Sequence, residues 1–80
     1  MAAMTTIWRI HTEDWAHLPA DARQAYVGIV GSYGGCCDRE GGGEFRRYGV
    51  AEICAHTLAH RLGIRADIAL TSKEVRRRAI

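Results

Sequence analysis

The segment from Gly49 to Gly63 constrains the fold more than any other part of this 80-residue chain. Most of its apolar residues recur at intervals of three and four, which places them on one face of an α-helix. This face comprises Val50, Ile53, Cys54, Thr57, Leu58 and Leu62. Gly63 ends the pattern, because glycine readily adopts the left-handed conformation that closes many helices, and Ile64 is placed to fold back onto the last turn. We therefore predict an amphipathic helix that needs a second layer to cover its apolar face.

A second helix is predicted after Pro19, a residue suited to the first helical position. Its expected inner face comprises Ala22, Tyr26, Ile29, Val30 and Tyr33. The glycine pair at 34–35 supplies a stop. Two glycines inside the segment each disfavour a helix by up to about 1 kcal/mol relative to alanine, so a strand over Tyr26–Tyr33 is the alternative.

Strands are predicted around these helices. Thr5–His11 is β-branched and aromatic without helical spacing, which is typical of a strand, and Thr12 is placed to cap a short turn after it. We expect Glu44–Tyr48 to form a short strand with Phe45 pointing inward. The alternation of apolar and polar residues over 66–71 predicts another strand.

The remaining segments complete the expected fold. Residues 36–44 contain three successive glycines and are predicted to form a mobile loop or a hairpin turn. Thr71 and Glu74 have the spacing of a capping box, which predicts a last helix whose Val75 and Ile80 reach the core. We expect one compact α+β domain over 1–80. Its two layers would be two or three short strands packed against two main helices and a short C-terminal helix.

Charge is divided unevenly along the chain, although the net charge is only +2. Residues 1–44 hold three arginines and six carboxylates, a balance of −3, whereas residues 45–80 hold eight basic and three acidic residues, a balance of +5. The carboxylates of the first half are Glu13, Asp14, Asp21, Asp38, Glu40 and Glu44. Such a cluster suits a positively charged partner. Ten of the eleven basic residues of the chain are arginine, which suits pairing with carboxylate or phosphate or reflects a compositional bias.

Cysteine usage and hydropathy favour a reducing compartment. Cys36 and Cys37 are neighbours, whose mutual disulfide would need a strained ring, and Cys54 is left over, so no disulfide framework is expected. We expect Cys54 to be a packed thiol. The longest stretch without charge, 24–37, is too short and too rich in glycine to span a bilayer, and no secretory leader is recognisable. We therefore expect a cytoplasmic protein with no membrane partner.

The side chains that most resemble a set of metal ligands lie on one flank of the helix predicted at 49–62. Glu52, His56 and His60 are four residues apart, but they extend over about 12 Å of helix axis, too far for all three to reach one ion. We interpret them as a solvated flank with Glu–His pairs, and we expect no metal or cofactor. A module that binds metal through His56 and His60 is the alternative.

The residues of this chain do not match the spacing of known enzyme motifs. The glycines at 28–35 do not match a dinucleotide fingerprint, and the only lysine, Lys73, is not part of a P-loop. Ser32 does not lie in a nucleophile elbow. We therefore expect no catalytic residues and no enzymatic activity.

A partial motif suggests DNA binding as the alternative function. Leu58–Ile64 is similar to the first helix and turn of a helix-turn-helix, and the basic run Arg76–Arg78 suits phosphate contacts. The segment after Ile64 does not match the second half of the motif, because Ala69 and Ser72 stand where a recognition helix needs apolar anchors. A small DNA-binding regulator with a partial helix-turn-helix and a basic C-terminus is therefore the second hypothesis.

These exclusions favour a binding module. Trp8, Trp15 and Tyr48 are candidate anchors for a protein partner, with packing in the core as the other interpretation. In its overall profile the whole chain resembles the anti-CRISPR proteins, small inhibitors encoded by phages and mobile elements. It is one small α/β domain with a clustered acidic stretch and no catalytic signature, and no specific motif is shared.

The resemblance implies a non-enzymatic inhibitor that docks on the basic, nucleic-acid-binding surface of a CRISPR effector complex and blocks DNA binding. The six carboxylates of the first half are the expected partner-binding residues. The net charge of +2 departs from the strongly acidic DNA mimics of that group. A local acidic patch would therefore have to make the contact.

Overall fold

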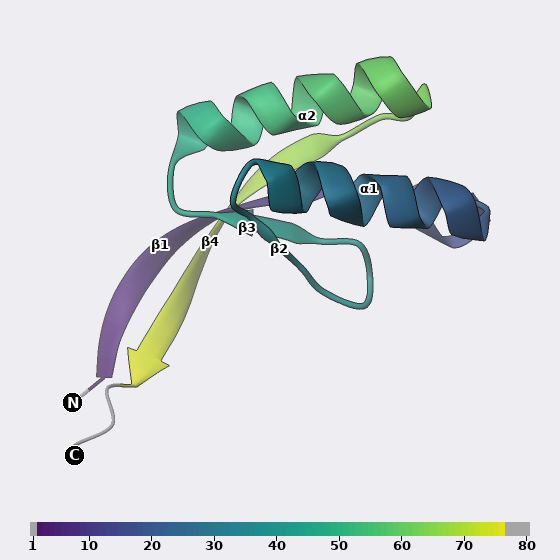
Figure 1. Cartoon of the computed structure of the whole chain (residues 1–80). Helices are drawn as coiled ribbons and strands as arrows, with labels where there is room; N and C mark the ends of the chain where they lie inside the picture. Colours follow the sequence, from purple (N-terminus) through teal and green to yellow (C-terminus); the bar gives the residue numbers. More distant parts are fainter. Residues whose placement is uncertain (1, 77–80) are drawn as a thin grey trace.

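The computed structural model describes residues 2–76 and shows two helices on one face of a four-stranded antiparallel sheet (Figure 1). The elements in chain order are β1 (Ala2–His11), the 3-10 turn η1 (Trp15–His17), α1 (Ala20–Ser32), β2 (Cys36–Cys37), β3 (Gly43–Phe45), α2 (Tyr48–Leu62) and β4 (Asp67–Arg76). The strand order is β2-β3-β1-β4. This is the split βαβ arrangement of ferredoxin-like domains. The expected small α+β architecture is therefore confirmed, with four strands instead of two or three.

The predicted C-terminal helix is wrong over the residues that the structure describes. Residues 67–76 form β4, which pairs antiparallel with β1 along its whole length, from Asp67 opposite His11 to Arg76 opposite Ala2. The ten-residue ladder overrides the capping-box pattern, which is a local signal that takes no account of an available strand partner. The end of the predicted helix, with Ile80, lies outside the described residues.

Two smaller corrections concern the hairpin between the helices. The strand predicted at Glu44–Tyr48 ends at Phe45, because Tyr48 already begins α2. The segment 36–44 is a hairpin whose first strand, β2, was not predicted. Cys36 pairs with Glu44 and Cys37 with Gly43, so only five residues are left for the turn.

Both predicted helices are confirmed. In α1, Tyr26 and Val30 are buried, which places the expected face inward and rules out the strand alternative. In α2, Cys54 and Leu58 are fully buried. Gly63 closes α2 in the left-handed conformation at φ 64°, and its N–H donates to the Ala59 carbonyl.

The core lies between the helices and the covered face of the sheet. Ile10 of β1 is fully buried with Tyr26, Val30, Cys54 and Leu58, and Ile64 folds back onto this cluster as expected. Ile53, a member of the predicted apolar face, lies outside it and is 56% exposed.

β1 and β4 continue beyond the region that the helices cover (Figure 1). β3 pairs with β1 only from Trp8 to Ile10, so within the described residues Ala2–Thr6 pairs with Ser72–Arg76 and with no third strand. We call this stretch the ribbon. It makes the molecule elongated, with extents of 43 × 23 × 21 Å and a radius of gyration of 13.5 Å. A compact chain of this length would have a radius of about 12 Å.

Candidate protein-binding surface

Asp38 organises the turn of the β2–β3 hairpin. Its Oδ1 accepts hydrogen bonds from the N–H groups of Glu40 and Gly42, both at 2.9 Å. Its Oδ2 accepts a hydrogen bond from Nη2 of Arg9 on β1 at 2.8 Å. The hydrogen bond from Arg9 is the main reason that the pKa of Asp38 is lowered, with the two backbone N–H groups acting in the same direction. Asp38 therefore holds the turn to the sheet.

Three of the six predicted carboxylates surround Arg9. Asp38 binds it directly, Glu44 lies opposite it in the β1–β3 ladder, and both act with Glu40 to raise the pKa of the guanidinium, the bond to Asp38 contributing most. Counting Arg39, which lies between Asp38 and Glu40, three carboxylates and two arginines leave this part of the surface with a balance of −1. Their position around Arg9 could not be seen in the sequence, because Arg9 is 29 residues from Asp38.

The other three predicted carboxylates lie around η1 and the start of α1. Thr12 caps the turn before η1 as expected, since its Oγ1 accepts a hydrogen bond from the Asp14 N–H at 3.1 Å. Glu13 is exposed. Asp14 Oδ2 is 3.5 Å from the Arg65 N–H, and Asp21 Oδ1 accepts from the Ala22 N–H at 2.9 Å. Asp14 and Asp21 therefore each have one carboxylate oxygen directed to the backbone.

Trp15 connects the two acidic segments, namely the hairpin turn with Asp38 and Glu40 and the η1 region with Glu13 and Asp14. A side chain at Gly41 would overlap the Trp15 ring, so the hairpin turn and η1 are in direct contact. The ring also meets Tyr26 edge-on, with centroids 5.2 Å apart, and lies 5.3 Å from the Arg23 guanidinium. Arg23 in turn donates to the carbonyl of Trp15 at 3.1 Å. The acidic segments thus meet on the side of the molecule away from the ribbon (Figure 1).

We call the joined surface of η1 and the hairpin turn the acidic end. Glu13, Asp14, Asp21, Asp38 and Glu40 lie on or beside these two segments, whereas Glu44 is in β3 and also lines a second groove with Arg46 and Arg47. Two of the candidate aromatic anchors pack against the core while remaining half-buried, namely Trp8 and Trp15. The third, Tyr48, is 44% exposed and has its ring centroid 4.9 Å from that of Trp8. Of the three, only Trp15 belongs to the acidic end.

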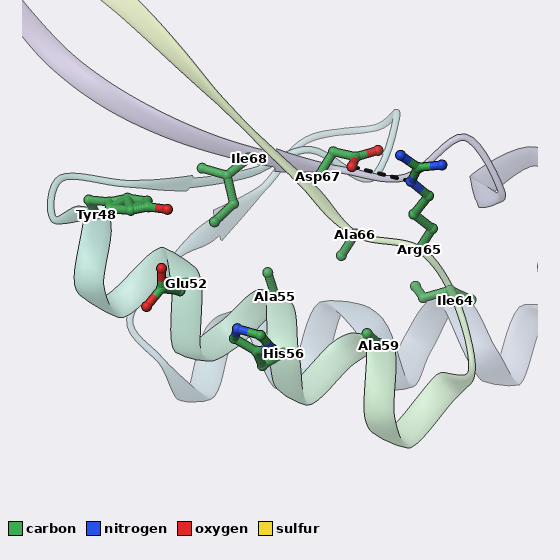
Figure 2. Close-up of a pocket in the computed structure, with 10 residues that line it drawn as sticks. All are labelled: Tyr48, Glu52, Ala55, His56, Ala59, Ile64, Arg65, Ala66, Asp67 and Ile68. Carbon is green, nitrogen blue, oxygen red and sulfur yellow. Dashed lines mark ion pairs between the residues drawn. The ribbon is translucent and has the colours of Figure 1, made fainter.

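A groove of about 640 Å³ lies elsewhere, between α2 and the start of β4 (Figure 2). Ala55, Ala59 and Ala66 are the small side chains that leave it open. Glu52 and His56 line the groove, whereas His60, which was considered with them as a metal ligand, is exposed on the next turn. Within residues 2–76 no three His, Cys, Asp or Glu side chains are close enough to share a metal ion.

Cys37 and Cys54 show no sign of nucleophilic activation. Cys54 is fully buried, which confirms the expected packed thiol, and burial raises its pKa to about 11. Burial likewise raises the pKa of Cys37 to about 11. Both thiols are therefore protonated at neutral pH, whereas a nucleophilic cysteine needs its thiolate form.

The sequence motif considered for DNA binding lacks its second helix. The chain after Ile64 enters β4 at Asp67, so a strand stands where a helix-turn-helix needs a recognition helix. Arg76 closes β4, and Arg77 and Arg78 lie outside the described residues. None of the helices within residues 2–76 has the length and apolarity needed to cross a membrane.

Comparisons of the chain with protein-family models, with curated proteins and with solved structures found no match.

Proposed function

We propose that this protein is a non-enzymatic inhibitor that uses its acidic end to occupy a basic, nucleic-acid-binding surface on a protein partner. The observation that carries the proposal is the contact between Trp15 and Gly41, which brings two acidic segments of the sequence to one end of the fold. The resemblance to anti-CRISPR proteins supplies the candidate partner, a CRISPR effector complex, and the host-cell cytoplasm as the place of action.

The distribution of contacts within the acidic end supports this proposal. Two of its arginines are engaged internally, since Arg9 binds Asp38 and Arg23 binds the backbone of η1, while Arg39 in the hairpin turn is exposed. Glu13 and Glu40 are exposed. A partner's arginines and lysines would therefore meet available carboxylates, while the internal pairs keep the end in shape. Electrostatic complementarity of this kind speeds association and selects the partner.

The same contacts decide which substitutions can test the proposal. Replacing Asp38 would disturb the hairpin itself, so loss of binding in such a variant would not identify a contact with the partner. Glu13→Lys and Glu40→Lys reverse exposed charges and leave Asp38 in place. Glu52→Lys is the matched control, because Glu52 is also exposed but lies on α2 beside the groove.

The experiment measures DNA binding by a panel of purified CRISPR effector complexes with and without this protein. We expect the wild type to block DNA binding by one of them, the double variant E13K/E40K to need at least about a tenfold higher concentration, and E52K to match the wild type. Raising the salt concentration should weaken the wild-type complex. Full inhibition by E13K/E40K would overturn the role of the acidic end, and failure of the wild type on every complex would overturn the choice of partner.

A further inference from the structure

The groove between α2 and the start of β4 has an apolar floor. Ala55 and Ala59 of α2 point toward Ala66 of the facing segment (Figure 2), and the buried Ile64 lies at one end. Because each alanine contributes only a methyl group, the space between the helix and the strand stays open. Its volume of about 640 Å³ is within the range of sites that bind small molecules.

Glu52 gives this groove its charge. The other carboxylate and the arginine that line the groove, Asp67 and Arg65, point away from α2 (Figure 2) and pair with each other at 3.5 Å. Glu52 is exposed and has no ion pair within the described residues. An occupant of the groove would therefore meet Glu52 as the carboxylate available for pairing.

Tyr48 lies one helical turn before Glu52 and completes the charged part of the groove. Its ring packs on Trp8, yet the residue stays 44% exposed. Its hydroxyl donates a hydrogen bond to the Glu52 carboxylate, which raises the pKa of Tyr48. Both partners attract cations, the carboxylate through its charge and the aromatic ring through its quadrupole. This pair therefore selects a positively charged group.

A ligand that fits the whole groove combines such a group with an apolar part. From Glu52 to Ala59 the groove follows α2 over about 10 Å of helix axis, and no further carboxylate lies in this stretch of the sequence. We propose that the groove binds a small organic cation, an amine or guanidine carried by an aliphatic chain. The cationic group binds at Glu52 and Tyr48, and the chain lies over Ala55 and Ala59. This activity goes beyond the proposed inhibition and does not depend on it.

Titration of the isotope-labelled full chain with hexylamine, followed by nuclear magnetic resonance, tests the site. A pH of about 7.5 limits protonation of histidine, so that His56 does not compete for Glu52. We expect saturable shifts of the amide signals around Glu52, Ala59 and Ala66, with a dissociation constant of about 1 mM. Hexanol and hexanoate keep the chain without the cation and should bind at least about tenfold more weakly. Equal binding of either one, or no saturable shift with hexylamine, would overturn the proposal.

Substitutions on the two parts of the groove test the placement of the ligand. Glu52→Gln keeps the shape and removes the charge, and should weaken hexylamine binding about tenfold. Glu13→Gln is the matched control, because it makes the same change at an exposed carboxylate of the acidic end. Ala59→Leu fills the groove and should abolish binding, whereas Ala25→Leu makes the same change at an exposed position of α1 and should not. Binding that is unchanged in E52Q or in A59L would overturn the proposed placement.

A lysine with acetylated and amidated ends distinguishes a free ligand from a side chain of a protein partner. We expect it to bind more weakly than hexylamine, because its amide groups would lose water over an apolar floor. Tighter binding would assign the groove to a protein partner and overturn the small-molecule ligand. E13K/E40K should bind hexylamine like the wild type, and E52Q should inhibit like the wild type. Failure of this proposal is therefore distinguishable from failure of the proposed inhibitory function.

Discussion

The two ends of β1 are held in different ways. At its C-terminal end, Arg9 binds the hairpin turn through Asp38, and Trp15 packs against both the turn and Tyr26. At its N-terminal end, Ala2–Thr6 pairs with Ser72–Arg76 of β4 and, within the described residues, with no third strand. Side-chain contacts thus hold the first end to the hairpin turn, η1 and α1, while in the second end the described pairing is a single ladder. The acidic end is therefore preorganised, whereas the ribbon is described only by the pairing of its two strands.

Trp15→Ala should give the largest effect at the anchored end. The substitution removes a half-buried indole together with its contacts to Tyr26, Gly41 and Arg23. We expect a loss of about 3 kcal/mol in the free energy of unfolding, measured by denaturant titration. A loss below about 1 kcal/mol would show that the hairpin and η1 are held together by other contacts.

Gly41→Ala isolates the contact between the hairpin turn and the indole. Gly41 has a φ of 80°, and a Cβ there would overlap the Trp15 ring. Gly34→Ala is the matched control, because Gly34 has a φ of 83° but open space around it. We expect G34A to cost about 1 kcal/mol from backbone strain and G41A to cost clearly more, about 2–3 kcal/mol. Equal losses would mean that the ring moves aside freely.

The contrast between the ends also explains what could be predicted from the sequence. Both helices have local signals, such as the apolar spacing from Val50 to Leu62 and the glycine that closes it, and these were confirmed. β4 was predicted only in part, because the capping-box spacing of Thr71 and Glu74 is local, whereas its pairing with β1 joins residues at opposite ends of the chain. A local pattern cannot report such a partner.

The candidate surface shows the same limit. Its six carboxylates were named from charge alone, which gave no information on their roles. The structure separates Asp38, whose hydrogen bonds hold the turn, from Glu13 and Glu40, which are exposed. The decisive contact, between Trp15 and Gly41, joins a residue expected in a turn with one expected in a loop. The groove beside α2 was missed because its signal is only the small size of Ala55 and Ala59 facing Ala66.

Asp38→Asn tests the charge in the anchored turn. The pKa of Asp38 is lowered in the folded state, so its ionised form stabilises the protein above the pKa of the unfolded chain, about 4, and this contribution is lost as the pH falls through the folded value. We expect D38N to be less stable by about 1 kcal/mol at pH 7, as is typical of a partly exposed ion pair. The difference from the wild type should shrink below about pH 4. A difference independent of pH would assign the effect to geometry and not to charge.

Thr6→Ala should have the smallest effect, because it lies in the ribbon. Thr6 is exposed and pairs with Ser72 through the backbone, and the substitution keeps that pairing while removing a β-branched side chain. We expect a loss of less than about 0.5 kcal/mol in the free energy of unfolding. Hydrogen exchange on the same sample should show faster exchange for amides of the ribbon than for those of Trp8–Ile10, which lie between two paired strands. Equal protection in the two stretches would mean that the ribbon is already supported on its outer edge.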